Sequence, residues 1–427
     1  LHFPDWLTIF LAQGLGGGIN TVLPLVPQIG MMYLFLSFLE DSGYMARAAF
    51  VMDRLMQALG LPGKSFVPLI VGFGCNVPSV MGARTLDAPR ERLMTIMMAP
   101  FMSCGARLAI FAVFAAAFFG QNGALAVFSL YMLGIVMAAL TGLMLKYTIM
   151  RGEATPFVME LPVYHVPHVK SLIIQTWQRL KGFVLRAGKV IIIVSIFLSA
   201  FNSFSLSGKI VDNINDSALA SVSRVITPVF KPIGVHQDNW QATVGLFTGA
   251  MAKEVVVGTL NTLYTAENIQ DEEFNPAEFN LGEELFSAVD ETWQSLKDTF
   301  SLSVLMNPIE ASKGDGEMGT GAMGVMDQKF GSAAAAYSYL IFVLLYVPCI
   351  SVMGAIARES SRGWMGFSIL WGLNIAYSLA TLFYQVASYS QHPTYSLVCI
   401  LAVILFNIVV IGLLRRARSP VSYTHLR

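Results

Sequence analysis

Charged residues are scarce in this 427-residue chain: they make up 13% of it, against about 25% in a soluble domain, whereas hydrophobic residues make up 55%. So few charges cannot cover a water-facing surface, and their clustering leaves long charge-free runs. Because the apolar core of a bilayer needs roughly 20 helical residues, these runs predict transmembrane helices. The low charge thus excludes an ordinary soluble protein and predicts an all-α, polytopic membrane protein.

The chain also lacks features that indicate other functions. Its formal net charge is zero, so no bulk field points to nucleic acid. Its four cysteines all lie in apolar runs, which is the wrong setting for a secreted disulfide framework. It contains no phosphate-binding Gly-Lys-Ser/Thr loop of the usual spacing, no His-Glu-x-x-His motif and no Ser-His-Asp arrangement. We therefore expect that this chain alone is not an enzyme.

Charge also divides the chain into parts. Residues 1–150 are predicted to form a first membrane half, residues 151–189 a basic cytoplasmic connection, and residues 190–264 the helices that open a second half. An acidic insert outside the bilayer is predicted at residues 265–332, because residues 265–331 hold fourteen acidic residues and three lysines. Residues 333–418 complete the second half. No single count of spans places both the acidic insert and the C-terminal arginines consistently with the charges of the loops. We therefore expect a re-entrant element that this count misses.

The two ends of the sequence carry expectations of their own. The chain begins at Leu1 without an initiator methionine or a basic leader, so we expect a truncated N-terminus rather than a signal peptide. Residues 420–427 resemble a translated sequencing-library adapter and are expected to be a non-native tail.

A short internal repeat relates the two halves. Residues 79–83, Ser-Val-Met-Gly-Ala, recur at residues 351–355, and residues 43–47, Gly-Tyr-Met-Ala-Arg, resemble residues 249–253, Gly-Ala-Met-Ala-Lys. Each copy of the first motif has a cysteine upstream, a proline close by and an arginine after it: Cys75, Pro78 and Arg84 in one copy, Cys349, Pro348 and Arg358 in the other. Each half is thus predicted to hold a Gly-x-Met-Ala-basic helix followed by a Gly- or Pro-broken helix.

Broken helices at matching positions of duplicated halves are the best sequence pointer to the substrate site of a transporter. The backbone groups freed at a break survive in a membrane only when they are buried or line a cavity. The alternative is that glycine and proline only allow helices to pack closely. We favour the substrate site, because two related breaks have matching neighbours.

The side chains at these breaks suit a transition-metal cation. A cation pathway needs groups that replace hydration water without holding the ion too tightly, and sulfur ligands favour softer metals over magnesium or calcium. The candidate ligands are the cysteines at the breaks and their polar neighbours: Cys75, Cys104, Cys349, Asn76, Ser79 and Ser351. The alternative is that these cysteines are plain apolar residues, as we predict for Cys399, which has no such neighbours.

Charged residues in or near the membrane are the other candidates. A charged side chain is energetically costly inside a bilayer, so those that occur there usually have a function. We count Glu40, Asp41 and Glu254 among the candidate metal residues. The alternatives are that Glu40 and Asp41 sit at the water interface and that Lys253 or Glu254 pairs across the halves, for instance with Arg47.

At these residues the sequence resembles the ferrous iron transport protein B (FeoB) family, most of all its enterobacterial members. The resemblance runs from about Leu1 to Ser419 and rests on four motifs: residues 72–78, 99–107, 249–254 and 347–349. The two halves correspond to what the family calls Gate segments. The resemblance implies Fe(II) uptake across the bacterial inner membrane, along a path that includes Cys75, Cys104 and Cys349.

The resemblance also implies partners that this chain does not contain. Family members carry an N-terminal cytosolic G domain that binds GTP with Mg²⁺, and this domain is missing from the sequence. The expected partners are the surrounding lipid bilayer and the small cytosolic accessory proteins of the family. Assembly of the chain into a homo-oligomer is also open. Two other interpretations stay open: a nucleoside-type Gate carrier, because Gate segments resemble parts of such transporters, and a membrane scaffold whose insert recruits partners.

Overall fold

The computed structural model describes residues 14–23, 25–150, 164–203, 217–251, 253, 255–265 and 320–416, so residues 266–319 of the acidic insert, residue 254 and the C-terminal tail lie outside it. Every regular element in these ranges is a helix, which confirms the predicted all-α fold. Five helical segments of the described part are long and apolar enough to cross a membrane: Pro89–Phe118, Gly120–Tyr147, Ala333–Glu359, Arg362–Ala387 and Pro393–Arg416.

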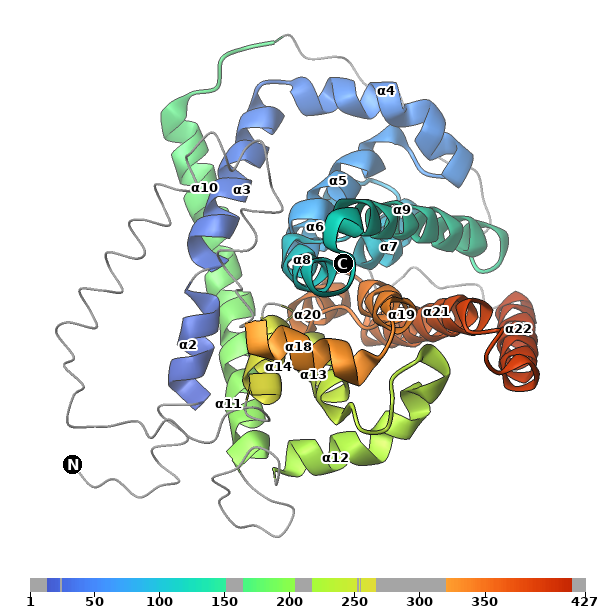
Figure 1. Cartoon of the computed structure of the whole chain (residues 1–427). Helices are drawn as coiled ribbons and strands as arrows, with labels where there is room; N and C mark the ends of the chain where they lie inside the picture. The colour runs from blue at the N-terminus through green and yellow to red at the C-terminus, as the bar shows by residue number, and fades with distance from the viewer. Residues whose placement is uncertain are drawn as a thin grey trace, which may run out of the picture.

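Two long helical segments stand beside the main bundle, on the left of Figure 1. One consists of α2 (Gly17–Val22) and α3 (Leu25–Asp41), and the other of α10 (Val169–Phe183) and α11 (Lys189–Ser203), joined by a π-helical turn. Helix α3 packs on α10, and α2 packs on α11. Glycine allows the close contact, since a Cβ at Gly18 would lie 3.1 Å from Ile192 Cα.

The first half follows in the upper part of Figure 1. It contains α4 (Tyr44–Leu59), α5 (Phe66–Gly74), α6 (Asn76–Gly82), α7 (Pro89–Met98), α8 (Gly105–Phe118) and α9 (Gly123–Tyr147). The second half lies below it and contains α12 (Ala218–Ile226), α13 (Trp240–Met251), α14 (Val255–Thr265), α18 (Thr320–Phe330), α19 (Ala333–Leu345), α20 (Ile350–Glu359), α21 (Arg362–Ala387) and α22 (Pro393–Arg416).

The halves share one apolar core. Helix α19 packs on α8 and α9 of the first half as well as on α21 of the second. Aromatic rings fill the contact: Phe114 of α8 lies 5.4 Å from Tyr339 of α19 and 5.5 Å from Phe330 of α18, between ring centroids. All three side chains are buried. The two halves are therefore joined through α8 and α19, which both begin or end at a broken segment.

Helices α5 and α6 form an antiparallel hairpin, not a single span. The Ser79 hydroxyl of α6 donates to the Pro68 carbonyl of α5 at 2.7 Å. At the open end of the hairpin, Lys64 Nζ lies 3.4 Å from Asp87 Oδ2. Both ends of the hairpin thus lie on one side, with Cys75 at its tip. We infer that this hairpin is the re-entrant element that the loop charges predict.

Basic residues gather on that same side. There, Arg90 at the start of α7 is joined to the chain just after α9, because its Nε donates to Met150 O at 2.9 Å. The ends of the spans on this side carry the basic residues Arg90, Arg92, Lys146, Arg358, Arg362, Arg415 and Arg416. By the positive-inside bias we infer that this side is cytoplasmic. The described chain resumes within the insert at α18, which leads into α19, and the first residue of α19, Ala333, lies at the opposite end of its span.

Helix α22 is held by polar side chains. The most apolar stretch of α22 buries none of its residues against the rest of the chain. Asn407 nevertheless reaches α21, where its Nδ2 donates to Ser378 Oγ at 2.8 Å and its Oδ1 accepts from Asn374 Nδ2 at 3.1 Å. Hydrogen bonds of this kind between membrane helices contribute about 0.6 kcal/mol on average.

We expect Asn407→Leu to loosen α22 without affecting the fold of the other helices, because it removes both contacts to α21. The free energy of unfolding in detergent should fall by about 1 kcal/mol, and α22 should become more accessible to protease. Leu405→Ala is the control, since Leu405 is 65% exposed on the same helix. Equal protease sensitivity of the two variants would show that the asparagine contacts do not hold α22.

Candidate functional site

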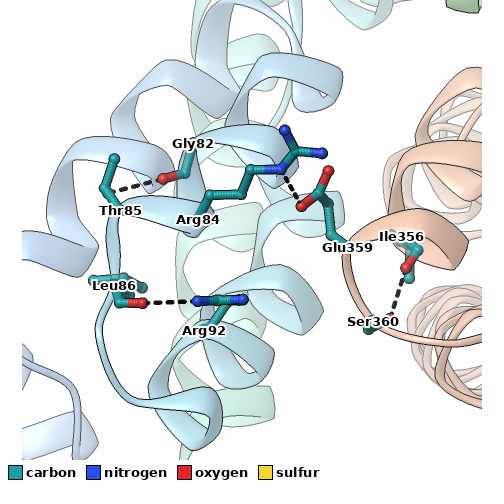
Figure 2. Close-up of polar contacts among 8 residues, drawn as sticks. All are labelled: Gly82, Arg84, Thr85, Leu86, Arg92, Ile356, Glu359 and Ser360. Atoms are coloured by element: carbon teal, nitrogen blue, oxygen red, sulfur yellow. Dashed lines mark hydrogen bonds and ion pairs between the residues drawn. The ribbon is translucent and has the colours of Figure 1, made fainter. Parts of the chain in front are cut away.

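The two copies of the internal repeat lie side by side. The first copy falls on α6 and the turn after it, the second falls on α20, and these two helices pack against each other. Figure 2 shows the ends of the two helices facing one another, with Arg84 directed at Glu359. The contact places two related broken helices at the boundary between the halves, where alternating-access transporters of duplicated design bind substrate.

Three of the four cysteines stand immediately before a helix. Cys75 precedes α6, Cys104 precedes α8 and Cys349 precedes α20, each with an extended or polyproline-like backbone (φ/ψ −152/132°, −80/165° and −59/155°). None of the three caps its own helix through the side chain, and none is in a disulfide bond. The positive end of a helix dipole stabilises a negative side chain, and the thiolate is the form in which cysteine binds metal.

The breaks at Cys75 and Cys104 contact each other. The Asn76 amide nitrogen donates to Met102 O at 3.2 Å, and a Cβ at Gly105 would lie 3.9 Å from Gly74 O. The side chain of Asn76 is buried, and its Oδ1 accepts no hydrogen bond from the residues that the structure describes. Asn76 thus presents an unused amide oxygen beside Cys75.

Arg107 holds the second break in shape. Its Nη1 donates to Pro100 O at 3.0 Å and to Met102 O at 2.9 Å, and its side chain is fully buried. These two carbonyls are left without helical partners by the 3-10 turn Ala99–Phe101, so the guanidinium replaces the missing hydrogen bonds. Close approach of α9 supports the same turn, because Gly134 is so near that a Cβ there would lie 2.8 Å from Phe101 O.

The third break lies against the Gly-Ala-Met-Ala-Lys segment. Tyr346 ends α19 just before Cys349, and the Nζ of the buried Lys253 lies 4.9 Å from the centroid of its ring. A Cβ at Gly249 would lie 2.5 Å from Tyr346 Oη. The matching basic residue of the first half, Arg47, lies instead over the ring of Tyr164 at 3.4 Å. Each of these two basic residues thus lies over a tyrosine ring, and the predicted pairing of Glu254 across the halves falls outside the described residues.

The other predicted site residues fall in different places. Ser79 is fully buried and donates to Pro68 O, so we assign it to the structure of the hairpin instead of to the metal ligands. Ser351 is half-buried in the first turn of α20. Glu40 pairs with Arg179 at 2.8 Å, and Asp41 accepts from Gln175 at 3.5 Å, so both belong to the contact between α3 and α10. Glu254 lies outside the described residues.

Sequence reasoning missed the contribution of α3. A Cβ at Gly74 would lie 3.0 Å from Met32 Sδ, and one at Gly105 would lie 3.5 Å from Gln28 Nε2. A thioether and an amide therefore lie next to the breaks at Cys75 and Cys104. The signal in the sequence was the presence of Gln28 and Met32 in a mostly apolar run. Nothing in the neighbouring sequence indicates which helix these two side chains face.

The donors do not form one closed chelate. Within the described ranges, no group of three or more His, Cys, Asp or Glu side chains is close enough to hold a metal ion. The cysteines instead mark the separate starts of α6, α8 and α20, of which α6 and α20 pack on each other. Conduction requires sites that bind an ion well enough to admit it and weakly enough to release it, and separated donors meet that requirement.

Fold and site together define a polytopic membrane protein with duplicated, helix-broken halves. A family model described as "Gate: Nucleoside recognition" matches residues 22–118 and 184–362, and one described as "Ferrous iron transport protein B C terminus" matches residues 127–179. The chain belongs to the ferrous iron transport protein B family and corresponds to the C-terminal membrane part of its members.

Curated relatives agree with this placement. The chain is 99% identical over 422 residues to the "Fe(2+) transporter FeoB" of Escherichia coli (strain K12), and 94% identical over 422 residues to that of Salmonella typhimurium (strain LT2). Each match covers 99% of this chain and 55% of the relative, so the chain spans about half the length of these proteins. No solved structure matches it.

Proposed function

We propose that this chain is the permease part of an Fe(II) uptake system and carries ferrous iron across the bacterial inner membrane into the cytoplasm. The observation that carries the proposal is the position of Cys75, Cys104 and Cys349, each directly before a helix at a break between the duplicated halves. The name of the relatives, "Fe(2+) transporter FeoB", supports the choice of metal.

The chemistry of the breaks agrees with ferrous iron. Fe(II) is borderline in softness, so thiolate and amide donors suit it better than they suit Mg²⁺ or Ca²⁺. Cys75 and the unused Oδ1 of Asn76 supply one such pair of donors, Cys104 lies at the adjoining break, and Cys349 begins the related helix of the other half. The ion passes from one set of donors to the next, without a single tight site that would trap it.

The remainder of the full-length protein supplies further functions under this proposal. We place GTP binding and hydrolysis, with the Mg²⁺ that accompanies the nucleotide, in the part of the relatives that this chain does not span. Small cytosolic accessory proteins and assembly into a homo-oligomer belong to the same proposal. This chain itself is the transport part and not an enzyme.

A nucleoside carrier is the second candidate, because the matching family model is described as nucleoside recognition. Such a site needs an aromatic ring that a base can stack on, together with amide groups. Tyr346, which precedes Cys349 at the third break, is buried and already faces Lys253. The contact favours the metal over the nucleoside.

The test is anaerobic Fe(II) uptake by vesicles containing the full-length protein, with Mn(II), Zn(II) and nucleosides as competitors. We expect Fe(II) to accumulate and transition metals, but not nucleosides, to compete. Nucleoside accumulation without Fe(II) uptake would establish the second candidate, and the absence of both would favour a membrane scaffold.

A further inference from the structure

An ion pair joins the two repeats at the ends opposite their cysteines. Arg84 follows α6, Glu359 ends α20, and Nε of Arg84 donates to Oε2 of Glu359, as Figure 2 shows. Of the ion pairs in the described part of the chain, the other two lie within one half or between the flanking helices, at Lys64–Asp87 and Arg179–Glu40. The Arg84–Glu359 pair, by contrast, connects the duplicated halves.

The pair lies at the end of the proposed path. Helix α6 begins after Cys75 and leads to Arg84, and α20 begins after Cys349 and ends at Glu359. At about 1.5 Å of rise per residue, the pair lies roughly 15 Å beyond the cysteines along both helices. It stands on the basic side, which we infer to be cytoplasmic. An ion that passes between α6 and α20 therefore meets this pair on its way out.

The two partners differ in burial. The Glu359 side chain is 6% exposed and the Arg84 side chain is 54% exposed. A buried carboxylate is costly without a cation beside it, whereas an exposed arginine loses little when it turns into water. When the pair opens, Arg84 is the side chain that moves, and a different cation must replace it beside Glu359.

The contacts around the pair limit which groups can move. Nε of Arg84 makes the bond to Oε2 of Glu359, and the guanidinium lies against the carboxylate in Figure 2. The hydrogen bond to Glu359 raises the pKa of Arg84, so its guanidinium keeps its charge. The turns around the pair are fixed by bonds from Thr85 Oγ1 to Gly82 O at 2.9 Å and from Ser360 Oγ to Ile356 O at 2.6 Å. Movement is thereby concentrated in the Arg84 side chain.

We propose that Glu359 receives the transported divalent cation at the cytoplasmic end of the path, and that Arg84 is a latch which occupies this carboxylate when no cation is present. The inference rests on the proposed function for the identity of the cargo. Oxygen donors at the exit weaken the hold on Fe(II) relative to the sulfur donors before it, which favours release. The competing explanation is a static clamp that only holds the halves together.

The test compares Arg84→Gln, Glu359→Gln and the charge-swapped double variant in full-length protein, with Lys64→Gln as a control that breaks a different ion pair. For a latch, we expect Arg84→Gln to raise the initial rate of Fe(II) uptake at least twofold and Glu359→Gln to lower it at least tenfold. The swapped variant, Arg84→Glu with Glu359→Arg, should restore thermal stability but not uptake, because its carboxylate lies at the exposed position 84 instead of the buried position 359. Equal losses in both single variants, with uptake restored by the swap, would show a static clamp and overturn the proposal.

A second measurement tests the latch independently of whether Fe(II) is the transported ion. In inverted vesicles, a membrane-impermeant thiol reagent reaches the path from the basic side and labels Cys75 and Cys349. We expect Arg84→Gln to increase this labelling severalfold, and Lys64→Gln to leave it unchanged, whether or not the wild type takes up Fe(II). Loss of Fe(II) uptake in the wild type would refute the proposed function, whereas unchanged labelling in Arg84→Gln would refute the latch.

Discussion

We expect Cys75→Ser and Cys349→Ser, each made in the full-length protein, to abolish Fe(II) uptake while membrane insertion and the proposed GTP hydrolysis continue. Serine keeps the size of the side chain and the extended backbone before the helix, but it replaces a thiolate by a hydroxyl. Loss of a group that supports a metal ligand costs 10- to 100-fold, so loss of the ligand itself should lower uptake by at least about tenfold. Anaerobic uptake into vesicles measures the effect, and thermal unfolding in detergent shows whether the membrane part is folded.

The chain provides its own control for this substitution. Cys399 lies on α22, whose most apolar stretch buries none of its residues, and it stands at no helix break. Cys399→Ser should therefore transport iron like the wild type. Unchanged uptake in both Cys75→Ser and Cys349→Ser would remove these cysteines from the mechanism.

Gly249→Ala is expected to damage the third break. The added Cβ would lie 2.5 Å from Tyr346 Oη and 2.7 Å from Val256 Cγ2, and both neighbours are buried. Tyr346 must then shift, and with it the segment that leads to Cys349. Overpacking of this kind costs about 1–3 kcal/mol, which thermal unfolding in detergent should detect. Uptake should fall more than stability alone explains, since the break is part of the path.

Gly258→Ala is the matched control for this change. Gly258 lies on the helix that follows, and no atom comes within 4 Å of a Cβ placed there. The substitution should leave uptake unchanged and stabilise the helix slightly, because alanine is favoured over glycine by about 1 kcal/mol in a helix. If the two variants unfolded at the same temperature and transported equally, the contact between Gly249 and Tyr346 would carry no weight.

Local patterns in the sequence were enough for several features of the fold. Low charge and long apolar runs indicated a helical membrane protein, and Gly and Pro beside cysteines indicated the breaks. The repeat predicted two related halves, and the packing of α6 on α20 brings its two copies together. Each of these features depends on residues close in sequence, where composition and spacing are direct evidence.

Features that depend on distant contacts could not be assigned in the same way. Residues 65–83 form an apolar run of nearly spanning length, and only the pairing of Lys64 with Asp87 and the bond from Ser79 to Pro68 show that the run turns back. The contact of Met32 with the break at Gly74 also joins residues far apart in the sequence. The pairing of Glu359 with Arg84 does so too, and the sequence did not distinguish Glu359 from an ordinary charge at a helix end.

The most direct test of the cysteine-lined path is protection of its thiols by the ion. Full-length protein in membrane vesicles would be alkylated anaerobically with and without Fe(II), and the modification of each cysteine-containing peptide would be followed by mass spectrometry. We predict that Fe(II) slows alkylation of Cys75, Cys104 and Cys349 and leaves Cys399 unaffected. Identical alkylation rates with and without Fe(II) at all four cysteines would contradict passage of iron along these helix breaks.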